Sequence, residues 1–270
     1  MNSKSLLLLV LSAILGQAVW AQSDQSPQPG ATKRQIRKQR INQLIRQEEE
    51  GELVYNKQSI FGYKQNTDGY ALTYEFGRFK SSKKTLLFQY EFSEKHHPKE
   101  SKIGGATNGY WLSSFKLGKL NNFYQLKVGV SQQQRIGGKA NKNGVAVSAI
   151  YGGALSIGLM KPYYYYFEVI DTASESSYTE VTTFDKQAPN SYIFQAAGFT
   201  KGLGESKFNP GLVAKGAIRF DYGRFRETVS AIEVGMAAEI YSRKVPQLAF
   251  VTPQTFFFNA YVSLLIGRRR

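Results

Sequence analysis

The sequence contains no cysteine, so no disulfide can cross-link the chain and no lipid anchor can be attached through a cysteine thiol. After the first 21 residues no run of 18 apolar residues occurs, which excludes a membrane-spanning helix in the remainder. Acidic residues are few, 20 against 35 lysines and arginines, and the net charge of +15 favours anionic partners. The fold must therefore be stabilised by burial and hydrogen bonding alone.

Residues 1–21 have the pattern of a signal peptide. Lys4 precedes an apolar run at 6–15, and Val19-Trp20-Ala21 supplies the site that a signal peptidase cleaves. Because the run is too short to cross a bilayer, we expect cleavage, a mature start at Gln22 and export. Export argues against nucleic acid as the anionic partner and favours lipid headgroups and lipopolysaccharide.

The segment 22–52 is polar and charged, unlike the rest of the chain. A weak helical stripe of Ile36, Ile41, Leu44 and Ile45 begins among basic residues and ends among acidic ones, which opposes the helix dipole. We expect a basic periplasmic segment, either a solvated tether or a helix that depends on a partner.

From Leu53 onward the chain consists of short alternating runs rich in Tyr, Phe, Val and Gly, which is typical of β-strands. Ten runs occur, at 56–66, 70–79, 84–93, 110–118, 122–131, 144–152, 154–169, 211–222, 228–241 and 254–267. Every long connection between them is odd-numbered, and the even-numbered ones are shorter. Outer-membrane barrels have this asymmetry, which predicts one antiparallel transmembrane β-barrel over 53–270 with about ten strands, and between eight and twelve.

Alternation within the runs predicts which face meets lipid. In the last run the even positions from Phe256 to Ile266 are all apolar. In the run before it the even positions from Ile232 to Ile240 are also apolar, while Glu233 and Glu239 point to the opposite face. An apolar exterior and a polar lumen are the pattern of transmembrane barrels. A secreted soluble β-protein is the alternative, although it would expose an unusually large apolar surface.

Charged residues on the opposite face are candidates for the lumen. They are Glu75, Glu91, Lys116, Lys127, Glu168, Lys215, Arg219, Asp221, Glu233 and Glu239. A lumen of ten strands encloses little more than side chains, so ions of both signs should pair across it and fill it. The alternative is a path for protons, ions or a small solute.

The stretch KPYYYYFEV at 161–169 is the most aromatic part of the chain. We expect Tyr163, Tyr165 and Phe167 to form an aromatic girdle at the membrane interface, with Tyr164, Tyr166 and Glu168 facing the lumen. The preceding Gly152-Gly153 fits a two-residue hairpin, because both glycines tolerate positive φ.

Other features suggest a gate, a tail or an enzyme. In the long connection 170–210, the stretch Tyr192–Phe199 is a candidate helical turn over the barrel mouth. Arg268-Arg269-Arg270 is expected as a periplasmic tail that meets headgroups or an acidic partner. His96 and His97 are adjacent, but no paired acids accompany them, so a surface hydrolase is only a second alternative and no cofactor or metal is expected.

The stretches KHHPKE (95–100) and GKANKNGVAVSAIYGGALSIGLMKPYYYYFEV (138–169), with the repeated turn-and-strand spacing, resemble a family of outer-membrane β-barrel proteins of Bacteroidota. The resemblance covers most of 53–270 and implies a porin-like fold in the cell envelope without catalytic residues. By analogy it also implies an accessory subunit of a larger outer-membrane complex for secretion or barrel assembly. A narrow channel for ions or small solutes is the alternative function.

Overall fold

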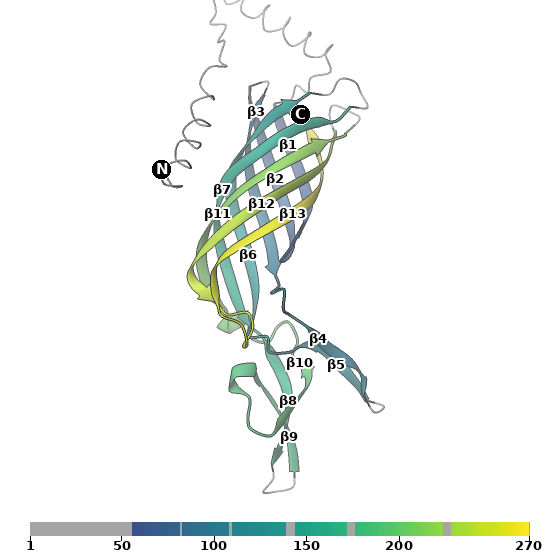
Figure 1. Cartoon of the computed structure of the whole chain (residues 1–270), viewed down its shortest axis with the longest axis vertical. Helices are drawn as coiled ribbons and strands as arrows, with labels where there is room; N and C mark the ends of the chain where they lie inside the picture. Colours follow the sequence, from purple (N-terminus) through teal and green to yellow (C-terminus); the bar gives the residue numbers. More distant parts are fainter. Residues whose placement is uncertain are drawn as a thin grey trace, which may run out of the picture. The chain divides into compact units, whose positions relative to one another are not determined.

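The structure is a computed structural model that describes residues 56–81, 83–107, 110–138, 144–171, 176–223 and 228–269 (Figure 1). Eight antiparallel strands close into a barrel in the order β1-β13-β12-β11-β7-β6-β3-β2. The barrel closes because β1 pairs with β2 on one side and with β13 on the other. The predicted fold class is confirmed, whereas the signal peptide and the basic segment lie outside the described residues.

The barrel strands are β1 (Lys57–Asn66), β2 (Gly69–Ser81), β3 (Lys84–Lys95), β6 (Asn121–Gly137), β7 (Ala146–Pro162), β11 (Lys207–Asp221), β12 (Thr228–Val245) and β13 (Gln254–Arg269). Their number is the lower bound of the predicted range, two fewer than the ten runs. Side chains alternate between inside and outside along most of the length of these strands, as the apolar periodicity predicted.

Two of the ten predicted runs do not form barrel strands of their own. The glycine pair Gly152-Gly153 is not a hairpin but lies in the middle of β7, where Gly152 pairs with Ser131 and Lys215 on the neighbouring strands. A Cβ on Gly152 would approach the Ser131 Cα to 2.5 Å, so this glycine permits close approach of two strands. The run at 110–118 lies outside the barrel.

The connections differ between the two ends of the barrel. At one end, here the loop end, lie 67–68, 96–120, 163–206 and 246–253. At the other, here the terminal end, lie 82–83, 138–145 and 222–227, together with the entry to β1 and the exit from β13. The two longest connections, 96–120 and 163–206, are both at the loop end, as the parity of connection length predicted. The connection predicted at 132–143 does not follow that parity, because it lies at the terminal end as 138–145.

The loop end carries further β-structure, here called the surface module. It consists of the hairpin β4 (Lys102–Thr107) and β5 (Tyr110–Lys116), the sheet β10-β8-β9 from β8 (Tyr164–Asp171), β9 (Ser176–Thr183) and β10 (Ser191–Ala196), and the 3₁₀ turns η2 (Phe184–Lys186) and η3 (Leu203–Glu205). The helical turn predicted at Tyr192–Phe199 is therefore wrong. Pairing with β8 supplies the backbone hydrogen bonds of β10 instead.

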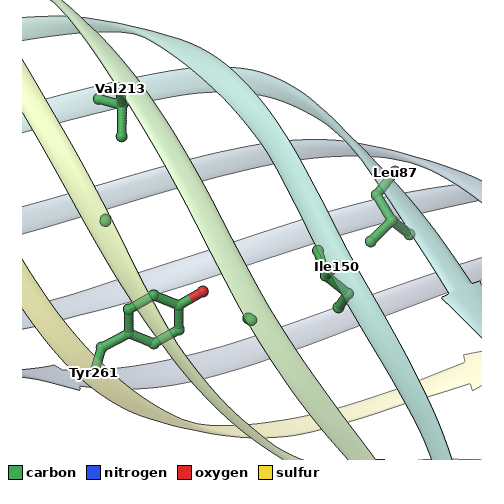
Figure 2. Close-up of a cluster of buried hydrophobic side chains, with 6 residues drawn as sticks. Leu87, Ile150, Val213 and Tyr261 are labelled. Carbon is green, nitrogen blue, oxygen red and sulfur yellow. The ribbon is translucent and has the colours of Figure 1, made fainter. Parts of the chain in front are cut away.

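Side chains fill the barrel interior in layers. Leu87, Ile150, Val213 and Tyr261 belong to a buried cluster on the inner face (Figure 2). Further clusters lie toward the terminal end, around Ile60 and Leu265, and toward the loop end, around Phe123 and Tyr241. Large apolar side chains are exposed on the outer face, among them Leu72, Leu126, Leu155, Leu212, Met236 and Ile266. Among the described residues, no helix is long and apolar enough to cross a membrane.

Candidate functional site

Arg219 is the centre of one charge network inside the barrel. Its Nη2 donates to Glu75 Oε2 and to Glu233 Oε2, both at 2.6 Å, and its Nε donates to the same Glu233 oxygen at 2.9 Å. Gln89 donates to Glu75 (2.6 Å) and the Tyr261 hydroxyl donates to Glu233 (2.8 Å). The guanidinium thus ties β11 to β2 and β12, and the second donors satisfy the remaining carboxylate oxygens.

A second network lies nearer the loop end and is built on Glu91 and Glu239. Lys127 Nζ donates to Glu91 at 3.0 Å and to Glu239 at 2.7 Å, and Lys64 also pairs with Glu91. Lys95 pairs with Asp68 and lies 3.4 Å from Glu239. Because each carboxylate has cations from two different strands, the charges are compensated across the lumen.

Asp221 and Arg269 form a third ion pair near the terminal end, and both are buried. The predicted tail is therefore corrected, because β13 continues through Arg269 and turns that side chain inward while Arg268 stays exposed. The Asp221 carboxylate also accepts the backbone N–H of Gly223 at 3.0 Å. Arg269 therefore helps to close the lumen.

A small cavity separates the first two networks. Its volume is about 30 Å³, and its polar lining includes Lys64, Glu75, Glu91 and Lys215. Lys215 has no ion pair within the described part of the chain. The volume suffices for only about two or three water molecules.

Eight of the ten residues proposed for the lumen lie on barrel strands and point inward: Glu75, Glu91, Lys127, Lys215, Arg219, Asp221, Glu233 and Glu239. Lys116 and Glu168 do not, because β5 and β8 belong to the surface module. Sequence reasoning missed Lys64, Asp68, Lys95 and Arg269 as partners. Period-2 alternation carried far enough along β1, β3 and β13 would have found Lys64, Lys95 and Arg269.

The aromatic girdle predicted at Tyr163, Tyr165 and Phe167 is wrong. Tyr165 and Phe167 are fully buried in a cluster with Phe115 of β5. Tyr163 is half-buried and packs against this cluster. An alternating pattern rich in aromatic residues does not distinguish a strand at a membrane interface from a strand whose side chains pack into a small protein core. The exposed aromatic side chains near the loop end of the barrel are instead Tyr70, Phe92, Phe208 and Phe256.

The surface module is fastened to the barrel mouth through the Tyr165 hydroxyl. That oxygen accepts the Lys119 N–H at 2.7 Å and lies 2.6 Å from the Lys116 carbonyl and 2.9 Å from the Lys119 carbonyl. Lys119 in turn forms a β-bridge with Leu248 of the connection between β12 and β13. Phe184 of the module also packs edge-on against Phe250, with 5.6 Å between ring centroids.

Glu100 anchors the base of the β4–β5 hairpin. Its carboxylate pairs with Lys116 and, at 2.7 Å, with Lys119. Burial alone would raise the pKa of Glu100, but the hydrogen bonds from both lysines outweigh it and hold the pKa below its ordinary value. Burial lowers the pKa of Lys119 to about 8, although Glu100 opposes that change. This cluster is a clamp between two segments of one connection.

The two histidines make different contacts. His96 lies 3.7 Å from Glu100 and 3.9 Å from Glu94, whereas the His97 Nδ1 accepts the backbone N–H of Lys99 at 3.1 Å. Burial lowers the pKa of both imidazoles. Among the described residues, no three His, Cys, Asp or Glu side chains converge as metal ligands.

No family model and no curated protein matches the chain. Among solved structures it is similar to Neisserial surface protein A, with 10% identity, a TM-score of 0.36 and coverage of 79% of this chain and 96% of that one. It is also similar to Ail, the attachment invasion locus protein of Yersinia pestis, with 9% identity, a TM-score of 0.36 and coverage of 80% and 100%. Ail in complex with the heparin analogue sucrose octasulfate gives 9% identity, a TM-score of 0.32 and the same coverage. The class of protein is a closed antiparallel β-barrel, and this assignment rests on the strand pairing of the chain and not on these similarities.

Proposed function

We propose that the protein is an integral outer-membrane β-barrel that presents its surface module to a partner, as an accessory subunit of a larger outer-membrane assembly for secretion or barrel assembly. Residues 1–21 act as a cleaved export signal and 22–52 as a basic periplasmic segment. The terminal end faces the periplasm and the loop end faces outward, since short turns on the inner side and long connections on the outer side are the rule for such barrels. Lipid and lipopolysaccharide surround the apolar outer face.

The filled lumen argues against a channel. From the loop end to the terminal end the lumen holds the Lys127 network, the Arg219 network and the Asp221–Arg269 pair, with a cavity of about 30 Å³ between the first two. Apolar clusters add further layers toward both ends. A solute would have to break several compensated ion pairs to pass, each of which is costly to separate in a buried site.

The observation that carries the proposal is the surface module. A loop that only connected β7 to β11 would need few residues, yet 163–206 forms a three-stranded sheet whose buried Tyr165 and Phe167 share a core with Phe115 of β5. Long connections with secondary structure of their own are usually functional. A rigid surface held above a closed barrel suits protein recognition better than transport.

Co-purification tests this function. The protein with a tag after Arg270 would be extracted from native outer membranes in mild detergent, and we expect a larger membrane protein in stoichiometric amount. A variant in which a short Gly-Ser linker replaces 164–196 should still insert but lose the partner. The matched control, Lys215→Met in the lumen, should keep it.

Two results would contradict the proposal. One is recovery of the native protein alone, and the other is retention of the partner by the linker variant. Planar-bilayer recordings then address the channel alternative, which requires a steady conductance whose ion selectivity changes in Lys215→Ala or Glu233→Ala.

A further inference from the structure

Strand β12 carries an irregularity near its outer end. Ile240 pairs with Phe256 and Val245 pairs with Gln254, so residues 241–244 of β12 oppose the single residue 255 of β13. Such a bulge breaks the regular ladder and redirects side chains, and bulges at barrel rims are often functional. The residues 241–244 are here called the rim bulge.

The rim bulge is held from inside the barrel by Asn209. This side chain is fully buried, and its Nδ2 donates to the Arg243 carbonyl at 2.8 Å. Its Oδ1 accepts the Arg243 N–H at 3.0 Å and the Ser242 hydroxyl at 2.9 Å. A buried carboxamide with three bonds to one short segment fixes that segment, so the bulge is a preorganised feature of the fold.

The rim bulge presents positive charge at the edge of the barrel. Arg243 and Lys244 are exposed, and so is Lys207 at the start of the adjacent strand β11. The acidic residue closest to Lys207 in sequence is Glu205 of η3, whose carboxylate accepts the Tyr164 hydroxyl at 2.7 Å. On β12 the nearest is Glu239, which points into the lumen and pairs with Lys127. None of the three cations forms an ion pair within the part of the chain that the structure describes.

Apolar side chains continue directly from these cations onto the outer face of the barrel. Phe208 is 67% exposed, Leu212 58% and Ile240 54%. Cations that end an exposed apolar surface match a ligand with anionic groups at one end and hydrocarbon at the other. In the orientation proposed above, they lie at the headgroup level of the outer leaflet.

We propose that Lys207, Arg243 and Lys244 bind the phosphate groups of a phosphorylated glycolipid of the outer leaflet, the lipid A part of lipopolysaccharide, while Phe208 and Leu212 contact its acyl chains. This site rests on the membrane orientation in the proposed function but not on the protein partner. Arginine and lysine side chains at a membrane surface each strengthen binding to anionic lipid, and arginine can donate to two phosphate oxygens at once.

The test measures binding of defined lipids to the purified, folded protein in detergent by native mass spectrometry. The probes are diphosphoryl, monophosphoryl and dephosphorylated lipid A. We expect affinity to fall as phosphates are removed, and to fall roughly 10- to 100-fold for diphosphoryl lipid A in Lys207→Gln/Arg243→Gln/Lys244→Gln, because each surface cation contributes about fivefold and salt screens part of it.

Two further variants keep the result interpretable. The control Lys99→Gln/Lys102→Gln/Lys186→Gln removes the same charge from exposed positions elsewhere at the loop end and should bind within about twofold of the native protein. The charge-conserving variant Lys207→Arg/Lys244→Arg should retain the affinity. Equal loss in the control, no loss in the rim triple variant, or indifference to phosphate number would each overturn the site. None of these results depends on co-purification of a protein partner.

Discussion

The Arg219 network offers a quantitative test of the filled lumen. In Arg219→Met, the carboxylates of Glu75 and Glu233 lose their shared cation while both remain buried, keeping only the donors Gln89 and Tyr261. Removal of one member of a buried ion pair costs about 3–5 kcal/mol, because the remaining charge is left without compensation. We therefore expect the free energy of unfolding to fall by about that amount.

A neutralised network separates this explanation from a simple loss of packing. In Arg219→Met/Glu75→Gln/Glu233→Gln, no charge remains to be compensated, so we expect the stability to return to within about 1 kcal/mol of the native protein or above it. The exposed Arg78→Met serves as the reference for loss of an arginine and should cost no more than about 0.5 kcal/mol.

The assay is urea unfolding in phospholipid vesicles, with the folded fraction read from circular dichroism and from the gel mobility of unheated samples. A cost below about 1 kcal/mol for Arg219→Met would refute the reasoning, because it would mean that water rather than Arg219 compensates the two glutamates. A triple variant as unstable as Arg219→Met would equally show that the effect is one of packing.

Three further predictions concern the loop end and the strand count. The depressed pKa of Glu100 means that its clamp contributes fully above the ordinary carboxyl pKa and is lost as the pH falls through the folded-state value. The protection of amides in 96–120 against hydrogen exchange, corrected for the slower intrinsic exchange at low pH, should therefore fall on acidification, and Glu100→Gln should remove that pH dependence. Tyr165→Phe removes the hydroxyl that partners the Lys119 N–H and two carbonyls, which should cost about 1–3 kcal/mol of stability. Limited proteolysis of the surface module should therefore be faster than in the control Tyr192→Phe, whose ring is 66% exposed. Equal rates would disprove the attachment through Tyr165. A tag inserted between Gly152 and Gly153 should abolish assembly, because it interrupts a continuous strand. The same tag between Lys186 and Gln187 should be tolerated and accessible on cells. Tolerance of the tag at the glycine pair would favour the ten-strand interpretation.

The sequence predicted the barrel because two independent signals agreed. Alternation placed Glu233, Glu239 and Arg219 on the polar side, and the parity of connection length placed the long segments at one end. Both signals follow from the backbone geometry of a closed sheet, in which neighbouring strands run antiparallel and successive side chains point to opposite faces. Both signals therefore do not depend on the contacts that individual side chains make.

The strand count and the girdle could not be read in the same way. Local pattern does not distinguish a glycine pair that turns the chain from one that lets strands approach closely, as Gly152 does beside Ser131. The alternation of KPYYYYFEV is equally compatible with lipid and with the small core that Phe115 completes. The difference depends on a contact between β8 and β5, about 50 residues apart in sequence, which no local window contains.

The attachment of the surface module has a consequence for the order of assembly. Lys119 pairs with Leu248, and Phe184 of the module packs against Phe250. Leu248 and Phe250 belong to the last connection of the barrel, which leads into β13, the strand that closes the barrel against β1. The module can therefore reach its final packing only after the carboxy-terminal hairpin is in place. A partner that recognises the docked module would therefore bind finished barrels and not incomplete ones.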